Sequence, residues 1–318
     1  MKNIYVIISL TLIFFMLLLP LLSLSTEAKE NVQNIAQTGS FLNVEASKSG
    51  KIKVKISESG EIKEIDEKDY ILGVLAAEMS AESEAEALKA QAVAAYSFML
   101  VRKSENAAGE YDITDSYLTD QHYIDEQKQN EKWGEKAAEN REKLKKIVNS
   151  VAGEYLCFDG KPALALYHAI SGGKTESALD VYGKEYPYLI SCDSLGDLFA
   201  AGYQSTAEVT AQEFCQKLGV NENDIKKIEL SCRPNGYVDT LKTGEKSFSG
   251  RDIRTTFSLR SANFQVNVKD DKVIFSVCGY GHGVGMSQAG ACYLAAQGST
   301  YKEILLWYYK GCTIEKSA

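Results

Sequence analysis

Residues 82–103 read ESEAEALKAQAVAAYSFMLVRK, a stretch with neither glycine nor proline. Its apolar residues recur at helical spacing, at Leu88, Ala92, Ala95 and Met99. The stretch is also rich in alanine, which has the highest helix propensity and lets neighbouring elements approach closely. It predicts a long helix that packs against the rest of the fold through its alanines.

The segments on either side of this helix predict a strand pair and a second helix. Residues 51–65, KIKVKISESGEIKEI, alternate polar and apolar positions around Ser59 and Gly60, which predicts two short strands with one buried face. Residues 124–149 are strongly charged and predict one helix with a solvated face. Its apolar stripe consists of Trp133, Ala137, Leu144 and Val148.

Beyond residue 150, short apolar runs broken by glycine predict a mixture of strands and short helices. Helices are expected at 208–218, 286–297 and 300–310, and strands at 226–232, 236–241, 263–268 and 272–278. Thr300 and Glu303 have the spacing of a capping box at the start of the last helix. Because helices and strands do not alternate strictly, the sequence predicts an α+β fold.

The composition excludes some classes of function. The chain has 318 residues, with 43 acidic and 35 basic side chains and a net charge of -8. Nucleic-acid binding needs a basic face to neutralise phosphates, so a general nucleic-acid binder is excluded. The seven cysteines show no C-x-x-C pair, and we interpret them as small buried apolar side chains rather than as a disulfide framework.

The N-terminal segment predicts a membrane anchor. Residues 4–24 carry no charge and would span about 31 Å as a helix, the thickness of a bilayer core. Lys2 precedes them, so the positive-inside rule places the body outside the cytoplasm of a single-pass cell-membrane protein. The predicted organisation is a transmembrane anchor at 1–24, a polar linker at 25–47 and a folded body at 48–316. A cleaved signal peptide is the alternative, although the apolar run exceeds the usual signal length.

One carboxyl group stands in an apolar context. Glu78 lies in YILGVLAAEMSAES, residues 70–83, after eight uncharged residues. At a strand or turn leading into a helix, such a carboxyl would be desolvated, which raises its pKa and suits it to donate a proton. The alternative is an ordinary glutamate at a helix start, where it complements the helix dipole.

Two glycine-rich segments carry the remaining candidates. YHAISGGKTESALDVYG, residues 167–183, places His168, Ser171 and Thr175 around a Gly-Gly turn, but the G-x-S-x-G motif of a serine nucleophile is missing. CGYGHGVGMSQAG, residues 278–290, breaks the G-x-G-x-x-G spacing of dinucleotide binding and carries His282, Ser287 and Gln288 towards a helix.

The chain has only three histidines, at positions 122, 168 and 282, and no short zinc spacing. All three fall in polar segments away from the charged helices, which predicts that they share one cleft. A hydrogen-bonded core residue is the alternative for His168.

These segments together resemble the family of stage II sporulation protein D and its amidase-enhancer relatives. The resemblance extends from about residue 50 to 315 and rests on YILGVLAAEM, EALKAQAVAAYSF, ITDSYLTDQHY, YHAISGGKTE, SFSGRDIRTTFSLRS, GYGHGVGMSQAGACYLAAQG and YKEILLWYYKG. It implies a membrane-anchored lytic transglycosylase with an α+β extracytoplasmic body and a central cleft. Such an enzyme cleaves peptidoglycan strands stripped of stem peptides during sporulation engulfment and leaves 1,6-anhydro ends.

The resemblance also implies roles for single residues. Glu78 matches the catalytic glutamate. Roles in orienting the glycan fall to Lys89, Gln121, Tyr123, His168, Ser171, Thr175, Tyr182, His282, Ser287 and Gln288. The family often has arginine where this chain has Tyr96 and tryptophan where it has Tyr182. Zinc-binding cysteines of some members have no counterpart after ITDSYLTDQHY, so neither a metal nor another cofactor is expected.

The expected partners are peptidoglycan glycan strands, the membrane through the N-terminal helix, and other wall hydrolases or scaffold proteins of engulfment. Nucleic acid is not among them. Two rival functions stay open. One is a non-catalytic amidase enhancer that binds the wall or a partner hydrolase, and the other is a zinc hydrolase.

Overall fold

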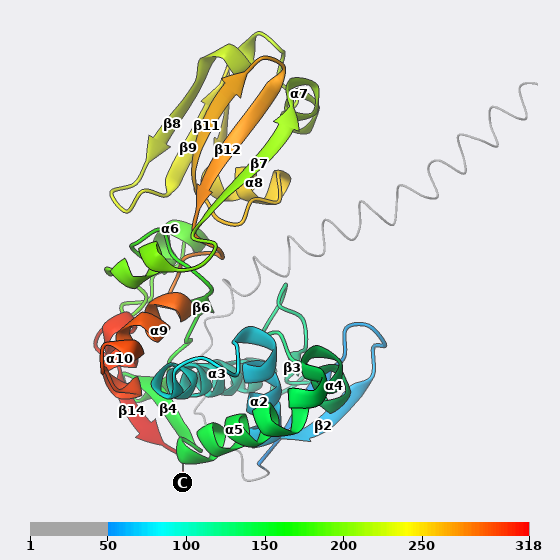
Figure 1. Cartoon of the computed structure of the whole chain (residues 1–318), viewed down its shortest axis with the longest axis vertical. Helices are drawn as coiled ribbons and strands as arrows, with labels where there is room; N and C mark the ends of the chain where they lie inside the picture. The colour runs from blue at the N-terminus through cyan, green and yellow to red at the C-terminus, as the bar shows by residue number, and fades with distance from the viewer. Residues whose placement is uncertain (1–49, 318) are drawn as a thin grey trace, which may run out of the picture.

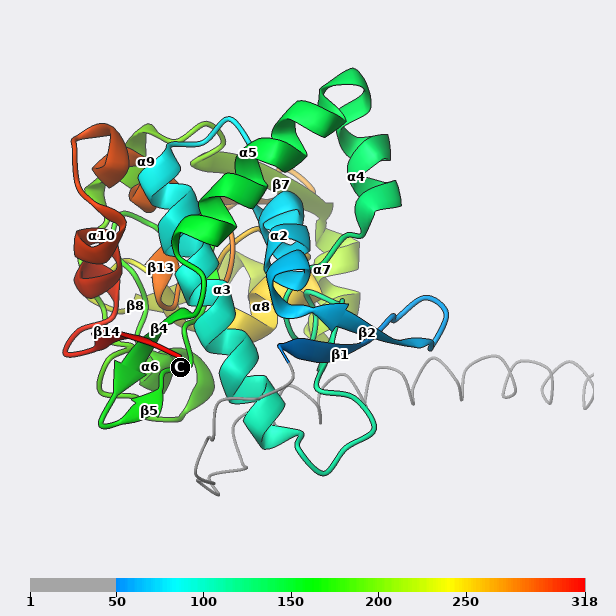
Figure 2. The same cartoon turned by 90° about the horizontal axis from the view of Figure 1, so that it is seen from below.

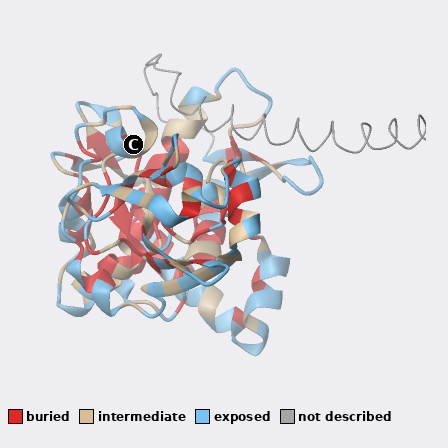
Figure 3. Cartoon of the chain, turned by 90° about the horizontal axis from the view of Figure 1, so that it is seen from above, coloured by how far each residue is buried: buried red, intermediate tan, exposed pale blue. Residues whose placement is uncertain are grey.

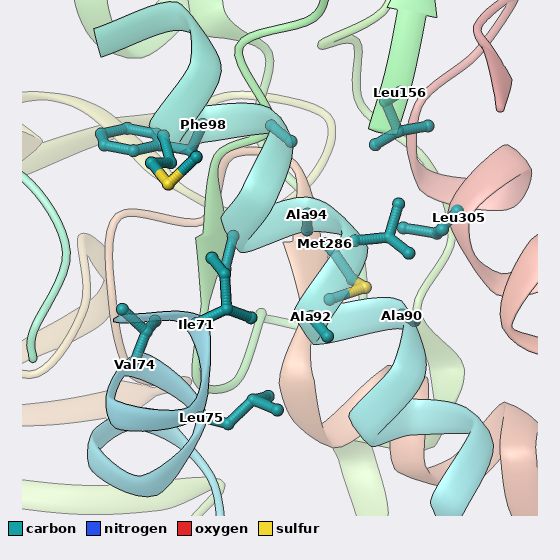
Figure 4. Close-up of a cluster of buried hydrophobic side chains, with 14 of the residues drawn as sticks. Ile71, Val74, Leu75, Ala90, Ala92, Ala94, Phe98, Leu156, Met286 and Leu305 are labelled. Carbon is teal, nitrogen blue, oxygen red and sulfur yellow. The ribbon is translucent and has the colours of Figure 1, made fainter. Parts of the chain in front are cut away.

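The fold is built around helix α3 (Ala85–Glu105), which confirms the long helix predicted around residues 82–103. The computed structural model describes residues 50–317 (Figure 1). In Figure 2, α3 runs between two pairs of helices that contact it, which are α2 (Glu67–Glu78), α5 (Ala137–Ser150), α9 (Gln288–Ala296) and α10 (Tyr301–Tyr308). The predicted alanine face is buried, as the close-up of Ala90, Ala92 and Ala94 shows (Figure 4).

The predicted N-terminal strand pair is confirmed. Strands β1 (Lys51–Lys55) and β2 (Ile62–Asp66) pair antiparallel, and β3 (Ile113–Thr114) adds in parallel to β1. Helix α2 follows β2 directly, because the Asp66 carboxylate accepts hydrogen bonds from the backbone N–H groups of Lys68 and Asp69 and so caps the helix start.

The single helix expected at 124–149 is wrong. Helix α4 (Glu126–Trp133) ends at Gly134, and a 3-10 turn, η1 (Gly134–Lys136), separates it from α5. Gly134 has φ of 56°, a left-handed conformation that glycine adopts without steric cost and that cannot continue a helix. The predicted apolar stripe packs into the fold on both sides of the break: Ala137, Leu144 and Val148 after it are buried, and Trp133 before it is partly buried against the core.

Two small sheets close this helical body. Strand β4 (Glu154–Phe158) lies between β5 (Lys161–Pro162) and β14 (Thr313–Lys316). Strands β6 (Tyr167–His168) and β13 (Met286–Ser287) form a two-residue parallel pair, which joins two segments far apart in the chain. The predicted capping box of Thr300 and Glu303 starts α10.

A second hydrophobic core lies in the part drawn at the top of Figure 1. One sheet has the order β11 (Asn263–Lys269), β12 (Lys272–Cys278), β7 (Gln204–Thr210), and the other has β10 (Lys246–Ser249), β9 (Val238–Thr243), β8 (Ile228–Cys232). Helices α7 (Ala211–Leu218) and α8 (Gly250–Thr256) and the 3-10 turn η3 (Asp224–Lys227) complete it. Phe214, Phe257, Phe264 and Phe275 pack together in its centre.

The two cores adjoin a short connecting region. It contains α6 (Ala178–Tyr182) and the 3-10 turn η2 (Leu195–Phe199), and the glycine-rich segment around residue 282 also passes through it. Figure 3 shows the buried residues gathered in the middle of the molecule and exposed residues around the periphery. Three of the seven cysteines, Cys157, Cys215 and Cys312, are buried, whereas Cys232 is exposed.

The fold class expected from the sequence needs a correction. The described residues form a mixed α+β fold, but the expectation of a transmembrane helix ahead of it is not met by any helix within residues 50–317. Helix α3 has the length, with 21 residues, but it carries Glu86, Lys89, Arg102 and Lys103 among its apolar residues. The segment 4–24, on which that expectation rested, and the expected linker 25–47 lie outside the described residues.

Candidate active site

Glu78 is the last residue of helix α2, not the end of a strand or the start of a helix as the sequence indicated. Its carboxyl group is half-buried. The backbone N–H of His122 donates to Glu78 Oε1 at 3.2 Å, and the Gln288 side chain also hydrogen-bonds to the carboxyl group. Segments that are far apart in the chain therefore hold this carboxyl in place.

Burial raises the pKa of the Glu78 carboxyl, while the hydrogen bonds from His122 and Gln288 and the charge of Lys132 oppose that rise. The position at a helix C-terminus adds to the cost of ionisation, because the helix dipole is negative there. Lys132 Nζ donates to the backbone oxygens of Ala76 at 2.7 Å and Ala77 at 3.2 Å. The site thus favours a carboxyl group that keeps its proton to higher pH than an exposed glutamate does.

The raised pKa of Glu78 predicts how the stability of the protein changes with pH. The folded chain holds the Glu78 proton more tightly than the unfolded chain, so ionisation costs stability as the pH rises through the unfolded and then the folded pKa. Glu78→Gln cannot ionise. We expect its Tm to exceed that of the wild type by a few degrees at about pH 7, and the difference to vanish near about pH 4. Calorimetry at both pH values tests this, and a variant no more stable at the higher pH would contradict it.

A buried polar network surrounds the glutamate. Gln121 is buried, and its amide donates to Tyr70 Oη and to the Ala95 carbonyl oxygen, each at 3.3 Å. The Tyr167 hydroxyl donates to Gln121 Oε1 at 2.9 Å. Burial, followed by the nearby Glu78 charge, raises the Tyr167 pKa well above its ordinary value, so this phenol stays protonated. The Tyr123 ring stacks on Tyr70 with centroids 5.4 Å apart.

Gly73 sets the spacing between helix α2 and the segment that carries His122. A Cβ atom at this position would lie 2.3 Å from the Tyr123 ring and 2.7 Å from the Ile124 carbonyl oxygen. The Ile124 N–H donates to the Gly73 carbonyl oxygen at 3.3 Å, so the two segments touch through their backbones. Only glycine permits this approach.

We therefore expect Gly73→Ala to push the segment around Tyr123 away from α2 and to lower the free energy of unfolding by about 1–3 kcal/mol. The His122 N–H should then hold Glu78 less well. Urea unfolding of Gly73→Ala, Tyr123→Ala and the double variant checks the cause, because relief of the clash makes the double variant cost less than the sum of the single ones. Strict additivity would mean that the contact is not the source of the loss.

A second group of predicted residues lies at the β6 and β13 pair, where His168 is part of β6. The rings of His168 and His282 have centroids 5.7 Å apart, and those of His282 and Tyr182 are 6.0 Å apart. His282 Nδ1 accepts the Val284 N–H at 3.1 Å, and its ring also hydrogen-bonds to the backbone of Tyr167, the neighbour of Glu78 in space. Burial lowers the His168 pKa to about 4 and that of His282 well below its usual value, so both rings are neutral near pH 7.

The side chains of a third group, Ser171, Thr175 and Ser287, make hydrogen bonds to other residues within the fold. Ser171 donates through its N–H and its hydroxyl to the buried Asp197 carboxylate, and the Ser287 hydroxyl donates to the same carboxylate at 2.6 Å. Thr175 Oγ1 accepts the Cys192 N–H at 2.9 Å. Ser171 bonds to Asp197 rather than to His168, so the geometry provides no serine and histidine pair. These three predicted residues position the loops around the site.

Lys89 makes its contacts with residues outside the network around Glu78. Its amino group pairs with Glu86 at 2.6 Å and lies over the Tyr301 ring. Tyr96, at the position where the family often has arginine, hydrogen-bonds to Glu67 and Ser317. The structure thus gathers Gln121, Tyr123 and Gln288 around Glu78, and brings His168, Tyr182 and His282 together next to them.

Comparison with known proteins identifies the family. Residues 55–158 match the family model described as stage II sporulation protein, SpoIID. Stage II sporulation protein D of Bacillus amyloliquefaciens is 36% identical over 264 residues, which cover 80% of this chain and 76% of that protein. The chain belongs to the stage II sporulation protein D family. The same protein from Bacillus subtilis is 36% identical over 265 residues with the same coverage, and the amidase enhancer of Bacillus subtilis is 25% identical over 302 residues, 76% of this chain and 40% of that protein.

The segment matched by the stage II sporulation protein model contains Glu78, Lys89, Gln121 and Tyr123. The sequence does not mark Asp197 or Lys132 as site residues, and it indicates only a polar helix position for Gln91. Asp197 sits in a stretch that gave no signal, whereas Gln91 lies within a quoted motif and accepts a hydrogen bond from Gln288 at 3.4 Å. Within residues 50–317, His, Cys, Asp and Glu side chains form no group of three that could hold a metal ion.

Proposed function

We propose that the chain is a peptidoglycan lytic transglycosylase that acts through Glu78 on glycan strands stripped of stem peptides. Membership of the stage II sporulation protein D family supports a role in sporulation and in the cell wall. The observation that carries the catalytic proposal is the half-buried Glu78 carboxyl, whose pKa burial raises and which the His122 N–H and Gln288 hold in place.

One carboxyl group is enough for this reaction. Protonated Glu78 donates its proton to the glycosidic oxygen as the bond to C1 of muramic acid breaks. The resulting carboxylate then accepts the proton of the C6 hydroxyl while that oxygen bonds to C1, which closes the 1,6-anhydro ring. Because the attacking hydroxyl belongs to the same sugar, its effective concentration is high and no second carboxylate is needed to activate a water.

The other predicted residues have different roles in this proposal. Gln288 and the His122 N–H stabilise the carboxylate between the two proton transfers. Tyr123, Tyr182 and His282 offer ring faces, and His168 offers its unpaired Nε2, to the sugars on either side of the cleaved bond. Ser171, Thr175 and Ser287 keep the loops in place, and Lys89, which pairs with Glu86, would contact the glycan outside the network around Glu78.

The proposed substrate also indicates where in the cell the folded body acts. Peptidoglycan lies outside the cytoplasm, so we place the folded body there. An enzyme that hydrolyses the amide between muramic acid and the stem peptide must act before this one, and wall hydrolases or scaffold proteins of engulfment are the natural partners.

Mass spectrometry of soluble fragments from stripped peptidoglycan tests the proposal, because anhydro ends identify the bond and the chemistry. The amidase-enhancer relative favours one alternative, a non-catalytic protein that binds the wall or a hydrolase. That alternative predicts binding without fragments, and retained activity after chelation would remove a zinc hydrolase.

A further inference from the structure

Three of the six arginines of this acidic chain occur together in the motif SGRDIRTTFSLRS, at positions 251, 254 and 260. The other three are all ion-paired: Arg102 with Asp120, Arg141 with Glu126 and Arg233 with Glu176. Among residues 50–317, no carboxylate oxygen pairs with Arg251, Arg254 or Arg260. Since acidic side chains outnumber basic ones, this lack of pairing is not a shortage of carboxylates.

The three guanidinium groups are also poorly supplied with hydrogen-bond acceptors. Arg251 donates to the Val181 carbonyl oxygen at 3.3 Å, and Arg254 donates through Nε to the Leu259 carbonyl oxygen at 3.4 Å. Arg260 Nε is buried without a partner. A guanidinium has five N–H donors, so most donors of this cluster are left for water or a ligand.

The cluster lies beside aromatic rings and next to the histidine group. Arg251 lies over the Tyr182 ring at 5.5 Å, and Arg260 lies over the Tyr280 ring at 4.3 Å. Arg254 is half-buried, and its charge acts on both His168 and His282. Burial, the stronger effect, and the charge of Arg251 both lower the Arg254 pKa. Like charges without a counter-ion favour the binding of an anion beside them.

His168 adds an independent sign of a ligand. Its Nδ1 faces the Val284 carbonyl oxygen at 3.1 Å, so Nδ1 carries the proton and Nε2 is an acceptor. Nε2 is buried and has no hydrogen-bond partner, although the side chain is only 4% exposed. A buried acceptor left unpaired is costly, and a sugar hydroxyl is a donor that would pair with it.

We propose that Arg251, Arg254 and Arg260 bind the carboxylate of the lactyl group on muramic acid. This inference rests on the proposed function and names what that site recognises. While a stem peptide is attached, the lactyl carbonyl is part of a neutral amide. Removing the peptide leaves a carboxylate, which the planar guanidinium fork binds in a bidentate manner. The cluster would therefore select stripped strands by charge.

A series of contacts connects this cluster to the network around Glu78. Arg251 lies over Tyr182, Tyr182 neighbours His282, and His282 hydrogen-bonds to the backbone of Tyr167, whose hydroxyl belongs to the network around Glu78. A glycan strand that extends from Glu78 along these contacts would present one of its muramic acids to the arginines.

Binding measurements can test this without relying on cleavage. The proteins carry Glu78→Gln so that ligands stay intact. Calorimetry would compare a stripped glycan oligomer with free lactyl carboxylates, the same oligomer with its carboxyls converted to methylamides, and a neutral N-acetylglucosamine oligomer of equal length. We expect the free acid to bind roughly tenfold more tightly than the methylamide, and this preference to weaken at high salt.

Arg254→Gln should remove the preference and leave binding of the neutral oligomer unchanged, and so should Arg251→Gln, an exposed position that does not threaten folding. Arg141→Gln removes the same charge elsewhere and should keep the preference. Equal affinity for acid and methylamide, or a preference that survives both cluster variants, overturns the inference. The measurement is of binding, so it can be interpreted even if Glu78 proves not to be catalytic. Conversely, finding no preference for the free acid would not contradict the proposal that Glu78 is catalytic.

Discussion

Glu78→Gln should abolish the release of soluble fragments from stripped peptidoglycan, with turnover reduced by roughly 10³-fold. The glutamine has nearly the same shape and can still accept the His122 hydrogen bond, but it can neither give a proton to the glycosidic oxygen nor take one from the C6 hydroxyl. Because a single group performs both transfers, both steps fail together. Counting anhydro ends by mass spectrometry measures the loss.

Glu82→Gln is the matched control. Glu82 is exposed, lies four residues further along, and only pairs with Lys136 at 3.1 Å. It should digest like the wild type. If Glu78→Gln digests as well as Glu82→Gln, Glu78 is not the catalytic group. If the wild type and both variants bind the glycan but none of the three releases fragments, the result supports the amidase-enhancer alternative.

Asp197→Ala should cause the largest loss of stability among single substitutions near the site. The carboxylate is completely buried and accepts hydrogen bonds from Ser171 and Ser287, which stand on the two glycine-rich segments. Removing the carboxylate leaves three buried donors without this acceptor: the N–H and the hydroxyl of Ser171 and the hydroxyl of Ser287. Each unpaired buried donor costs about 1–3 kcal/mol. We expect the free energy of unfolding to fall by about 3 kcal/mol or more, measured by urea denaturation.

Asp193→Ala provides the comparison four residues away. Asp193 is exposed and pairs only with Lys174 on the surface, at 3.1 Å, so its loss should be close to neutral. Asp197→Asn should fall between the two, because the amide keeps an acceptor oxygen but loses the charge. An Asp197→Ala protein as stable as Asp193→Ala would show that the two loops are held by other contacts.

Local patterns predicted most elements and some of their ends. The alanine-rich run 82–103, the alternation after residue 51 and the Thr300 and Glu303 capping box all act within a few residues, and all were confirmed. The break at Gly134 was missed because the apolar stripe runs through it in register. Glu78 was placed at a strand or turn because its apolar neighbours fit either element, and the buried contacts of α2 with α3 and α5 decided for a helix.

Gln121, Tyr123 and Gln288 lie near Glu78 in the structure. The role in orienting the glycan that the family resemblance implies for them stays a prediction. Ser171, Thr175 and Ser287 look like ligand-binding residues in a glycine-rich sequence, yet their hydroxyls are used inside the fold. The hydroxyls of Ser171 and Ser287 are occupied because both donate to Asp197. These serines lie 26 and 90 positions away from Asp197 in the chain, and nothing in the sequence around Asp197 indicates that its carboxylate would pair with them.

The sequence alone therefore determined the α+β class, the family and the glutamate in an apolar setting, because each depends on residue types and short spacings. The tertiary structure decided the rest: which hydrogen bonds hold Glu78, which hydroxyls stay free, and which arginines are left without a carboxylate. Those properties depend on distances between groups that lie far apart in the chain, and pKa, burial and pairing are set by such distances rather than by order along the backbone.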